Sequence, residues 1–393
     1  MILRMKITKI ESFVLLVPDY DSQACSSAQD DIVVKIQTDE GIVGIGETDT
    51  NPWATKAYIE SPGTHIMALG LRESLLGQDP LQTEALWDKM YTSTAMSGRR
   101  GLGICAIGAL DMALWDIKGK ALQKPIWELL GGARQAKIRP YASLLPNGNT
   151  LEGYASNLQE KLVQAKKYGF TAAKLEVCVN GPYSHGGLQE GNSAVTKIVA
   201  SCREAVGPNM TLMVDVAYAW NDWRTALQVI ETLEPYDIFF VETPVATDDL
   251  DGYAKLAQRS PIRIAAGEWL QTRFEFQDLI DRGNVDVAQP DIGRVGGITE
   301  ARRVIEYANL RGRIIVPHCW KTGIGIAASA HLAAASSNCP FIEYLPGELS
   351  ESAIRKELVK GELEMVRGEI ALPQKPGLGI DLEEAAIQKY RVK

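Results

Sequence analysis

Six ionisable residues recur at nearly regular intervals in the second half of the chain, each where an apolar, β-rich stretch ends. They lie 23 to 27 residues apart, at Asp215, Glu242, Glu268, Asp291, His318 and Glu343. This interval fits one strand, one helix and two loops. In a (β/α) barrel the carboxyl ends of the parallel strands meet at one rim, which is where such barrels carry their chemistry. The spacing therefore predicts that these side chains share one rim.

Asp215, Glu242 and Glu268 end three consecutive predicted strands, so a barrel places them side by side. Each acid taken singly is an ordinary surface residue, but three adjacent carboxylates in a dry barrel mouth repel one another unless a cation lies between them. A ligand set made only of oxygen atoms favours Mg²⁺ over Zn²⁺, and Mg²⁺ keeps positions open for water or substrate oxygens. The trio therefore predicts a Mg²⁺ site.

Asp291 and His318 end the next two predicted strands. A carboxylate beside an imidazole fixes its tautomer and raises its basicity, so the pair is a candidate general base, although His318 alone would equally suit a structural role. On an earlier strand, Lys174 and Glu176 are two residues apart and face the same way. Lys174 either neutralises a substrate carboxylate or pairs with Glu176 to close that side of the barrel.

Two further residues have both a functional and a structural interpretation. Glu343, at the end of the last predicted strand, either hydrogen-bonds a polar substrate or is a buried acid paired with a neighbour. His185 lies in a glycine-rich loop after the strand of Glu176, where it either reaches the substrate or is solvated.

Composition limits the class of protein. The chain has 393 residues, of which 46% are hydrophobic and 23% charged, values ordinary for a globular protein with a large core. A net charge of -8 and the lack of basic clusters argue against nucleic acid as a partner. The six cysteines form no Cys-x-x-Cys pair, which favours reduced thiols. The first residues do not resemble a signal peptide and no apolar run reaches membrane-spanning length, so we expect a cytoplasmic protein without a membrane partner.

The order of strand-like and helix-like segments along the sequence predicts an α/β protein in three parts. Residues 1–132 are predicted to form an α+β capping domain, with alternating strand patterns at 6–17 and 31–46 and helices at 53–91, 101–122 and 125–132. The polar segment 18–27 is either a mobile flap or a surface loop. Residues 133–348 alternate between strand and helix, as (β/α)₈-type barrels do. Residues 349–393 are expected to return to the capping domain.

Within the barrel we predict eight strands and seven intervening helices. The strands are expected at 139–144, 172–177, 211–215, 238–242, 263–267, 285–289, 313–317 and 341–344. The helices are expected at 151–168, 192–205, 223–233, 250–260, 273–282, 299–311 and 323–337.

These motifs resemble the enolase superfamily, and specifically its mandelate racemase subgroup. The resemblance spans essentially the whole chain and includes the small-residue helix from Ala109 to Gly119, the ordered carboxylate trio, the aspartate–histidine pair and the last-strand glutamate. It implies a modified TIM-like barrel with an N-terminal capping domain that the C-terminal tail completes. It also implies a homo-oligomer, since members of this shape usually form dimers or octamers.

The resemblance assigns roles to the candidate residues. Asp215, Glu242 and Glu268 would bind Mg²⁺, which holds a substrate carboxylate while the proton on its α-carbon is removed. Removal of that proton creates a dianionic enediolate that only concentrated positive charge stabilises. His318, oriented by Asp291, would be the base. Lys174 would hold the substrate carboxylate together with Mg²⁺, and Glu343, when protonated, would donate to it.

Two departures from the subgroup pattern narrow the reaction. The subgroup has Lys-x-Lys on the second barrel strand, and the second lysine, a base on the opposite face, is replaced by Glu176. Related dehydratases often carry Asn where Ala217 stands. A racemase needs acid and base on both faces, so we expect instead a hydro-lyase that dehydrates an aldonate or aldarate to a 2-keto-3-deoxy acid.

Three alternatives remain at this level. An epimerase would use Glu176 as the second acid or base. A muconate-type cycloisomerase would want a lysine at the end of the sixth barrel strand, where the sequence has none. A non-catalytic barrel would be expected to have lost at least one of the three metal ligands, and all three are present. Residues that we expect to contact a sugar acid are Glu176, Tyr20, Asp21, Trp53, His185 and Trp320.

Overall fold

The computed structural model describes residues 5–22, 29–350 and 352–392. Its N-terminal part pairs an antiparallel sheet with a group of helices. The sheet has the order β1 (Ile7–Leu16), β2 (Asp30–Thr38) and β3 (Val43–Thr48). The helices that follow are α1 (Pro52–Glu60), α2 (Leu71–Leu75), α3 (Thr83–Ser93), α4 (Ala95–Gly98), α5 (Leu102–Leu122) and α6 (Ile126–Leu129). The α+β pattern expected for this part of the chain is therefore present.

Helix α5 is the central element of this N-terminal part. It is apolar on nearly every side and almost wholly buried, as expected of a helix surrounded by other elements. One side packs against β3, where the absence of side chains at Gly44 and Gly46 lets the strand approach the carbonyl groups of Ala113 and Ala109. Another side meets the barrel, because Trp115 donates through Nε1 to Thr299 Oγ1 at 2.8 Å.

The remainder of the chain is built on an eight-stranded parallel sheet. The spatial order is β11-β10-β9-β8-β7-β6-β5-β12, so the last barrel strand pairs with the first. The strands are β5 (Pro140–Leu144), β6 (Ala172–Glu176), β7 (Thr211–Asp215), β8 (Ile238–Glu242), β9 (Arg263–Ala266), β10 (Val287–Ala288), β11 (Ile314–Ile315) and β12 (Ile342–Tyr344). Parallel neighbours bring all their carboxyl ends to one rim.

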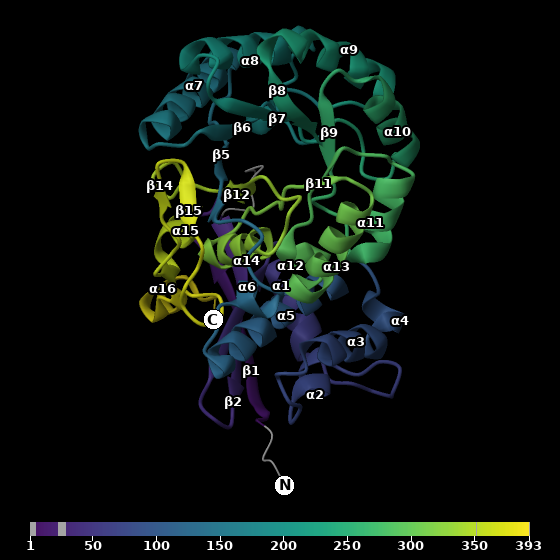
Figure 1. Ribbon diagram of the computed structural model, residues 1–393, viewed down its shortest axis with the longest axis vertical. Helices are drawn as coiled ribbons and strands as arrows, with labels where there is room; N and C mark the ends of the chain where they lie inside the picture. The colour runs from purple at the N-terminus through teal and green to yellow at the C-terminus, as the bar shows by residue number, and fades with distance from the viewer. Residues whose placement is uncertain (1–4, 23–28, 351, 393) are drawn as a thin grey trace.

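Helices surround these strands, and Figure 1 shows several of them in an arc outside β6 to β9. They are α7 (Leu151–Lys167), α8 (Ser193–Val206), α9 (Trp223–Leu233), α10 (Leu250–Arg259), α11 (Thr272–Asp281), α12 (Ile292–Val295), α13 (Gly297–Leu310) and α14 (Gly323–Ala334). Side-chain caps define some of their starts: Thr150 accepts from the backbone of α7, Asp222 from α9 and Asp249 from α10. Each such helix buries one apolar face against the sheet.

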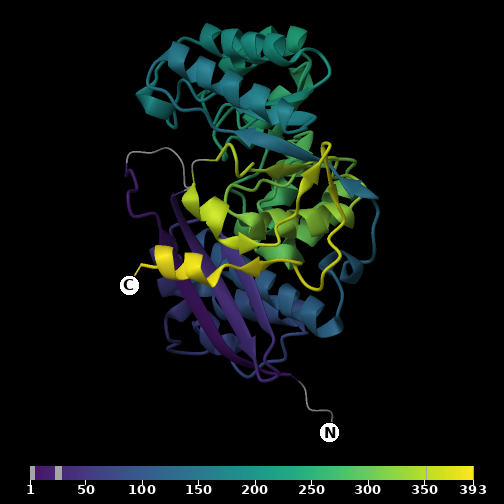
Figure 2. The ribbon, with the colours of Figure 1, turned by 90° about the vertical axis from the view of Figure 1, so that its left-hand side faces the viewer.

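The last segment runs back along both parts of the molecule. It contains α15 (Ala353–Glu357), β13 (Val359–Lys360), β14 (Met365–Val366), β15 (Glu369–Ala371), β16 (Asp381–Leu382) and α16 (Glu384–Tyr390). β15 pairs with β4 (Lys137–Ile138), ahead of the barrel. Val392 donates its backbone N–H to Val14 on β1, and Figure 2 shows the yellow α16 lying across the purple strands. The tail therefore contacts the N-terminal sheet.

The structure departs from the sequence prediction mainly in the length of three elements. The strands expected at 285–289 and 313–317 pair only over Val287–Ala288 and Ile314–Ile315. The strand expected at 285–289 is followed by Pro290, and the strand expected at 313–317 ends on Pro317. A proline has no N–H with which to continue a ladder. The helix expected after Pro125 is the single turn Ile126–Leu129. Among the described residues no helix is both long and apolar enough to cross a membrane.

Candidate active site

Asp215, Glu242 and Glu268 meet at the carboxyl ends of β7, β8 and β9. Asp215 and Glu242 are the last residues of their strands and stand in register with each other, and Glu268 follows two residues after β9. One oxygen from each carboxylate lies within 4.8 Å of the others, and all three residues are buried. The side chains that the spacing predicted as metal ligands are therefore together.

Each of these carboxylates is anchored through one oxygen, and the other oxygen faces the shared space. Asp215 Oδ1 accepts hydrogen bonds from Thr243 Oγ1 at 2.8 Å and from the Ala217 N–H at 2.9 Å. Glu242 Oε2 accepts from Gln289 Nε2 at 2.6 Å. Glu268 Oε1 accepts from Tyr218 OH at 2.9 Å. The oxygens left over are Asp215 Oδ2, Glu242 Oε1 and Glu268 Oε2. Three converging, preoriented oxygens suit a hard cation such as Mg²⁺.

The electrostatics of the trio agree with a cation site. Burial raises the pKa of Glu242 to about 8; Lys174 opposes the increase, and Asp215 and Glu343 add to it. Burial likewise raises the pKa of Glu268, opposed by His318 and reinforced by Asp215. Buried acids that repel one another are stabilised by a divalent ion between them. The residues present therefore fit Mg²⁺, and enolase superfamily enzymes generally bind this ion.

Lys174 provides the positive charge beside the trio. Its Nζ lies 2.7 Å from Glu242 Oε1, 2.9 Å from Glu343 Oε1 and 3.8 Å from Asp215 Oδ2. Burial lowers the pKa of Lys174, but Glu242 and Glu343 outweigh burial and hold it well above the usual value, so the ammonium stays charged. Of the two interpretations of Lys174, the pair with Glu176 is not the arrangement found, because Lys174 contacts acids of other strands.

His318 and Asp291 form the pair expected from the sequence. His318 Nδ1 lies 2.8 Å from Asp291 Oδ2, and Asp291 is itself fixed because its Oδ1 accepts from the Arg294 N–H at the start of α12. An Nδ1–H that donates to Asp291 leaves Nε2 as the basic nitrogen. Nε2 lies 3.3 Å from Glu268 Oε2, so it is directed at the carboxylate trio. Burial lowers the pKa of His318, whereas Glu343, Asp291 and Glu268 raise it, to about 9.

Glu343 closes the site from β12. Its Oε1 accepts from Ser143 Oγ at 2.6 Å, and its Oε2 accepts from the Cys319 N–H at 2.8 Å. Burial raises the pKa of Glu343, but Lys174 and His318 outweigh burial, so the net shift is downward. In this arrangement Glu343 is a hydrogen-bond acceptor rather than the protonated donor that the resemblance implied.

His185 is not the solvated loop residue that one interpretation of the sequence allowed. It is buried, and its Nε2 lies 3.1 Å from Glu176 Oε1. Cys178 Sγ lies 3.7 Å from the same oxygen. Glu176 is therefore held by the loop that follows β6, on the same face of the strand as Lys174.

A cavity of about 490 Å³ opens between the N-terminal segment, the barrel and the tail. Trp320 and Asp21 line this cavity together with Ser143 and Lys321, which places two predicted substrate contacts at its wall. Tyr20 and Trp53 are 52% and 45% exposed and do not line it. Residues 23–27 of the segment interpreted as a flap or a surface loop lie outside the described residues.

Several residues of the site were not identified from the sequence. Gln289 precedes Asp291 by two residues on one strand end, a spacing that could have indicated a shared face. No spacing in the sequence indicates the three hydroxyl residues of the site, because each contacts an acid on another strand. They are Ser143, Tyr218 and Thr243. The remaining missed group lies behind His318, where Asp49 pairs with Arg294 and with Lys321.

The fold and the site together define a parallel barrel whose strand ends carry three converging carboxylates and an aspartate–histidine pair. Residues 9–131 match the N-terminal domain of mandelate racemase and muconate lactonizing enzyme, and residues 157–386 match the enolase C-terminal domain-like family. The chain therefore belongs to the mandelate racemase/muconate lactonizing enzyme family of the enolase superfamily.

Its relatives carry out more than one reaction. D-galactarolactone cycloisomerase from Agrobacterium fabrum is 30% identical, over 99% of both chains. Arabinonate dehydratase from Saccharolobus solfataricus is 32% identical, over 92% of this chain and 91% of that one. The crystal structure of 3,6-anhydro-D-galactonate cycloisomerase from Zobellia galactanivorans superimposes with a TM-score of 0.85 at 33% identity, over 99% of this chain and 100% of that chain.

Proposed function

We propose that this enzyme dehydrates a sugar acid, an aldonate or aldarate, to a 2-keto-3-deoxy acid with the aid of Mg²⁺. The observation that carries the proposal is the direction of His318 Nε2. The nitrogen is oriented by Asp291 and lies 3.3 Å from an oxygen of the carboxylate trio. A substrate carboxylate held at the trio therefore presents its α-carbon to this base. The similarity to arabinonate dehydratase supports the choice of substrate class.

The residues divide the reaction among themselves. Asp215, Glu242 and Glu268 would hold Mg²⁺, which would supply positive charge that favours an enediolate. Lys174 binds the substrate carboxylate and offsets the second negative charge. His318 Nε2 takes the α-proton, and the C–H electron pair moves into the carboxylate group of the substrate.

Loss of water completes the sequence. As the enediolate electrons return to form the carbon–carbon double bond, the bond to the β-oxygen breaks. The His318 imidazolium gives its proton to the departing hydroxyl, so water leaves and the histidine is neutral again. The enol product then tautomerises to the 2-keto-3-deoxy acid, which equals the substrate minus one water.

Cycloisomerisation is the second candidate, because two of the relatives are cycloisomerases. The first step is unchanged: His318 removes the α-proton. The difference is that the departing β-oxygen belongs to a ring and remains attached to the product. Epimerisation is a weaker candidate, since it would require the Glu176 carboxylate, in place of the subgroup's second lysine, to exchange a proton on the opposite face.

The test is a screen of purified protein with Mg²⁺ against aldonates, aldarates and their lactones and anhydro derivatives, with 2-keto-3-deoxy acids detected as semicarbazones. We expect turnover of at least one open-chain acid, and loss of turnover after Mg²⁺ is chelated and its return when Mg²⁺ is added back. Turnover of only cyclic substrates would replace dehydration by cycloisomerisation. Exchange of the α-proton with deuterated water and no elimination would favour epimerisation.

A further inference from the structure

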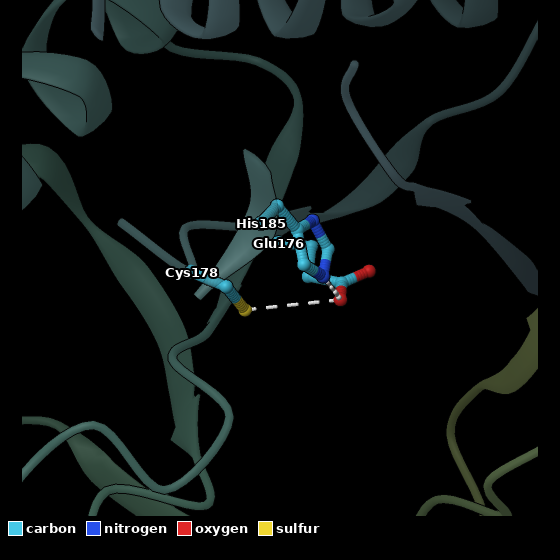
Figure 3. Close-up of side chains that lie close together, drawn as sticks. All are labelled: Glu176, Cys178 and His185. Carbon is cyan, nitrogen blue, oxygen red and sulfur yellow. Dashed lines mark hydrogen bonds and ion pairs between the residues drawn. The ribbon is translucent and has the colours of Figure 1, made fainter. Parts of the chain in front are cut away.

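A second group of donor side chains lies at the end of β6, and Figure 3 shows its three members, Glu176, Cys178 and His185, close together. Glu176 is the last residue of β6, Cys178 follows two residues later, and His185 begins the short 3₁₀ turn His185–Gly187. One ligand atom from each lies within 4.8 Å of the other two. The proposed dehydration uses none of these three side chains as a metal ligand.

The separations within this group match those around a zinc ion. His185 Nε2 lies 3.1 Å and Cys178 Sγ 3.7 Å from Glu176 Oε1. Tetrahedral Zn²⁺ with bonds of about 2.0 to 2.3 Å sets neighbouring ligand atoms about 3.3 to 3.6 Å apart. These two separations therefore differ from the tetrahedral values by a few tenths of an ångström, and Cys178 Sγ and His185 Nε2 lie within 4.8 Å of each other.

The backbone around the group is fixed by hydrogen bonds. Tyr154 OH donates to the Glu176 carbonyl at 2.7 Å and accepts from the Cys178 N–H at 3.1 Å. The His185 N–H donates to the Cys178 carbonyl at 2.9 Å, which folds the loop back over the strand end. The three side chains are thus brought together by the fold of the loop as well as by their own contacts.

The chemistry of the donors differs from that of the trio. Sulfur, imidazole nitrogen and one carboxylate oxygen form a set that selects Zn²⁺ or a similar ion, whereas three carboxylates select Mg²⁺. Burial, together with Glu176 and Asp215, raises the pKa of the Cys178 thiol well above its usual value. Without a metal ion the thiol keeps its proton and donates to Glu176, and a thiophilic cation would displace that proton.

We propose that Glu176, Cys178 and His185 bind one Zn²⁺ or another thiophilic divalent ion. Three protein ligands leave a fourth position for water or an oxygen of a ligand. Glu176 and His185 keep 16% and 10% of their side chains accessible, so the group is not sealed from solvent. Glu176 stands in register with Asp215 on the neighbouring strand, which puts this site beside the oxygen-only trio.

The test uses Co²⁺ as a spectroscopic probe for Zn²⁺ in the metal-stripped full-length protein. Saturating Mg²⁺ is present to fill the oxygen-only trio. We expect one equivalent of Co²⁺ to produce a near-ultraviolet thiolate-to-cobalt charge-transfer band and the strong visible bands of tetrahedral Co²⁺. One equivalent of Zn²⁺ should abolish both. The readout does not depend on the proposed dehydration.

Two cysteine variants decide whether Cys178 is the ligand. Cys178→Ser should lose the charge-transfer band, while Cys202→Ser, which alters another buried thiol on α8, should keep it. A wild-type protein without the band, or a band that survives in Cys178→Ser, would overturn the proposal. If Cys178→Ser does not fold, His185→Gln decides: the proposal requires weaker Co²⁺ binding, and unchanged binding refutes it.

Discussion

At the scale of single residues, the site works by dividing the two oxygens of each carboxylate between two tasks. One oxygen accepts a hydrogen bond from a neighbouring side chain, as Glu242 Oε2 does from Gln289 Nε2, and the other is left to face the shared space. Anchored ligands lose little conformational freedom when an ion binds, and their orientation is set before it arrives. The same logic applies to His318, since Asp291 occupies Nδ1 and leaves Nε2 for the substrate.

Replacing His318 tests the role of this nitrogen. His318→Asn removes the basic nitrogen but keeps a polar side chain of similar size. We expect kcat to fall by about 10³-fold or more, because general-base catalysis and the return of the proton to the leaving group are both lost. Mg²⁺ binding, measured by calorimetry, should be unchanged. Substantial remaining activity in a correctly folded variant would remove His318 from the mechanism.

The sequence indicates the candidate metal ligands better than it indicates the residues that orient these ligands by hydrogen bonds. Asp215, Glu242 and Glu268 were found because chemically distinctive residues occur at the regular ends of strands. Ser143 and Tyr218 were missed, since a hydroxyl in a barrel strand or loop gives no sign of which distant acid it contacts. Trp53 was expected near the substrate because of its place in the capping domain, yet it is 45% exposed and away from the described cavity.

At the scale of elements, the period of the hydrophobic pattern determined most of what could be predicted. Helix α9, at Trp223–Leu233, and strand β7, at Thr211–Asp215, have the predicted bounds. The shorter ladders of β10 and β11 could not be read from the apolar pattern alone, since pairing also requires N–H donors in register.

The contact between α5 and α12 (Ile292–Val295) links the N-terminal domain to the loop that carries Asp291. A Cβ atom added at Gly108 would lie 2.1 Å from the carbonyl oxygen of Gly293. Gly108→Ala should therefore destabilise the protein by about 1 to 3 kcal/mol despite the better helix propensity of alanine. The free energy of unfolding, measured in denaturant, gives this difference.

Gly191→Ala is the matched control for that substitution. A Cβ atom at Gly191 meets nothing within 4 Å, so we expect a change within about 0.5 kcal/mol. If Gly108→Ala is as stable as its control, α5 moves freely relative to α12 and the close approach does not fix the Asp291 loop.

At the scale of the whole molecule, one histidine joins the three parts of the chain. His331 on α14 accepts through Nδ1 from the backbone N–H of Trp127 in α6, at 3.2 Å, and its Nε2 donates to the carbonyl of Leu378 in the tail, also at 3.2 Å. The Trp127 contact requires the neutral ring, because a proton on Nδ1 would face the Trp127 N–H, whereas the Leu378 contact needs only the proton on Nε2. Burial lowers the pKa of His331 from 6.5 to about 4, opposed by the Leu378 hydrogen bond.

This lowered pKa makes the assembly of the three parts sensitive to acid. The unfolded chain takes up a proton at His331 below about pH 6.5, whereas the folded chain resists until about pH 4. The contribution of His331 to stability is thus complete above pH 6.5 and is lost as the pH falls through 4. A difference of about 2.5 units corresponds to about 3 kcal/mol.

His331→Gln tests this link, because glutamine offers an acceptor and a donor but does not titrate. Between pH 6.5 and 4 the wild type should lose about 3 kcal/mol more unfolding free energy than the variant. Acids elsewhere titrate equally in both proteins and cancel in the comparison. His65→Gln, at an exposed position in the N-terminal part, should follow the wild-type curve. Parallel curves for wild type and His331→Gln would mean that His331 does not couple pH to the joining of the tail, α6 and α14.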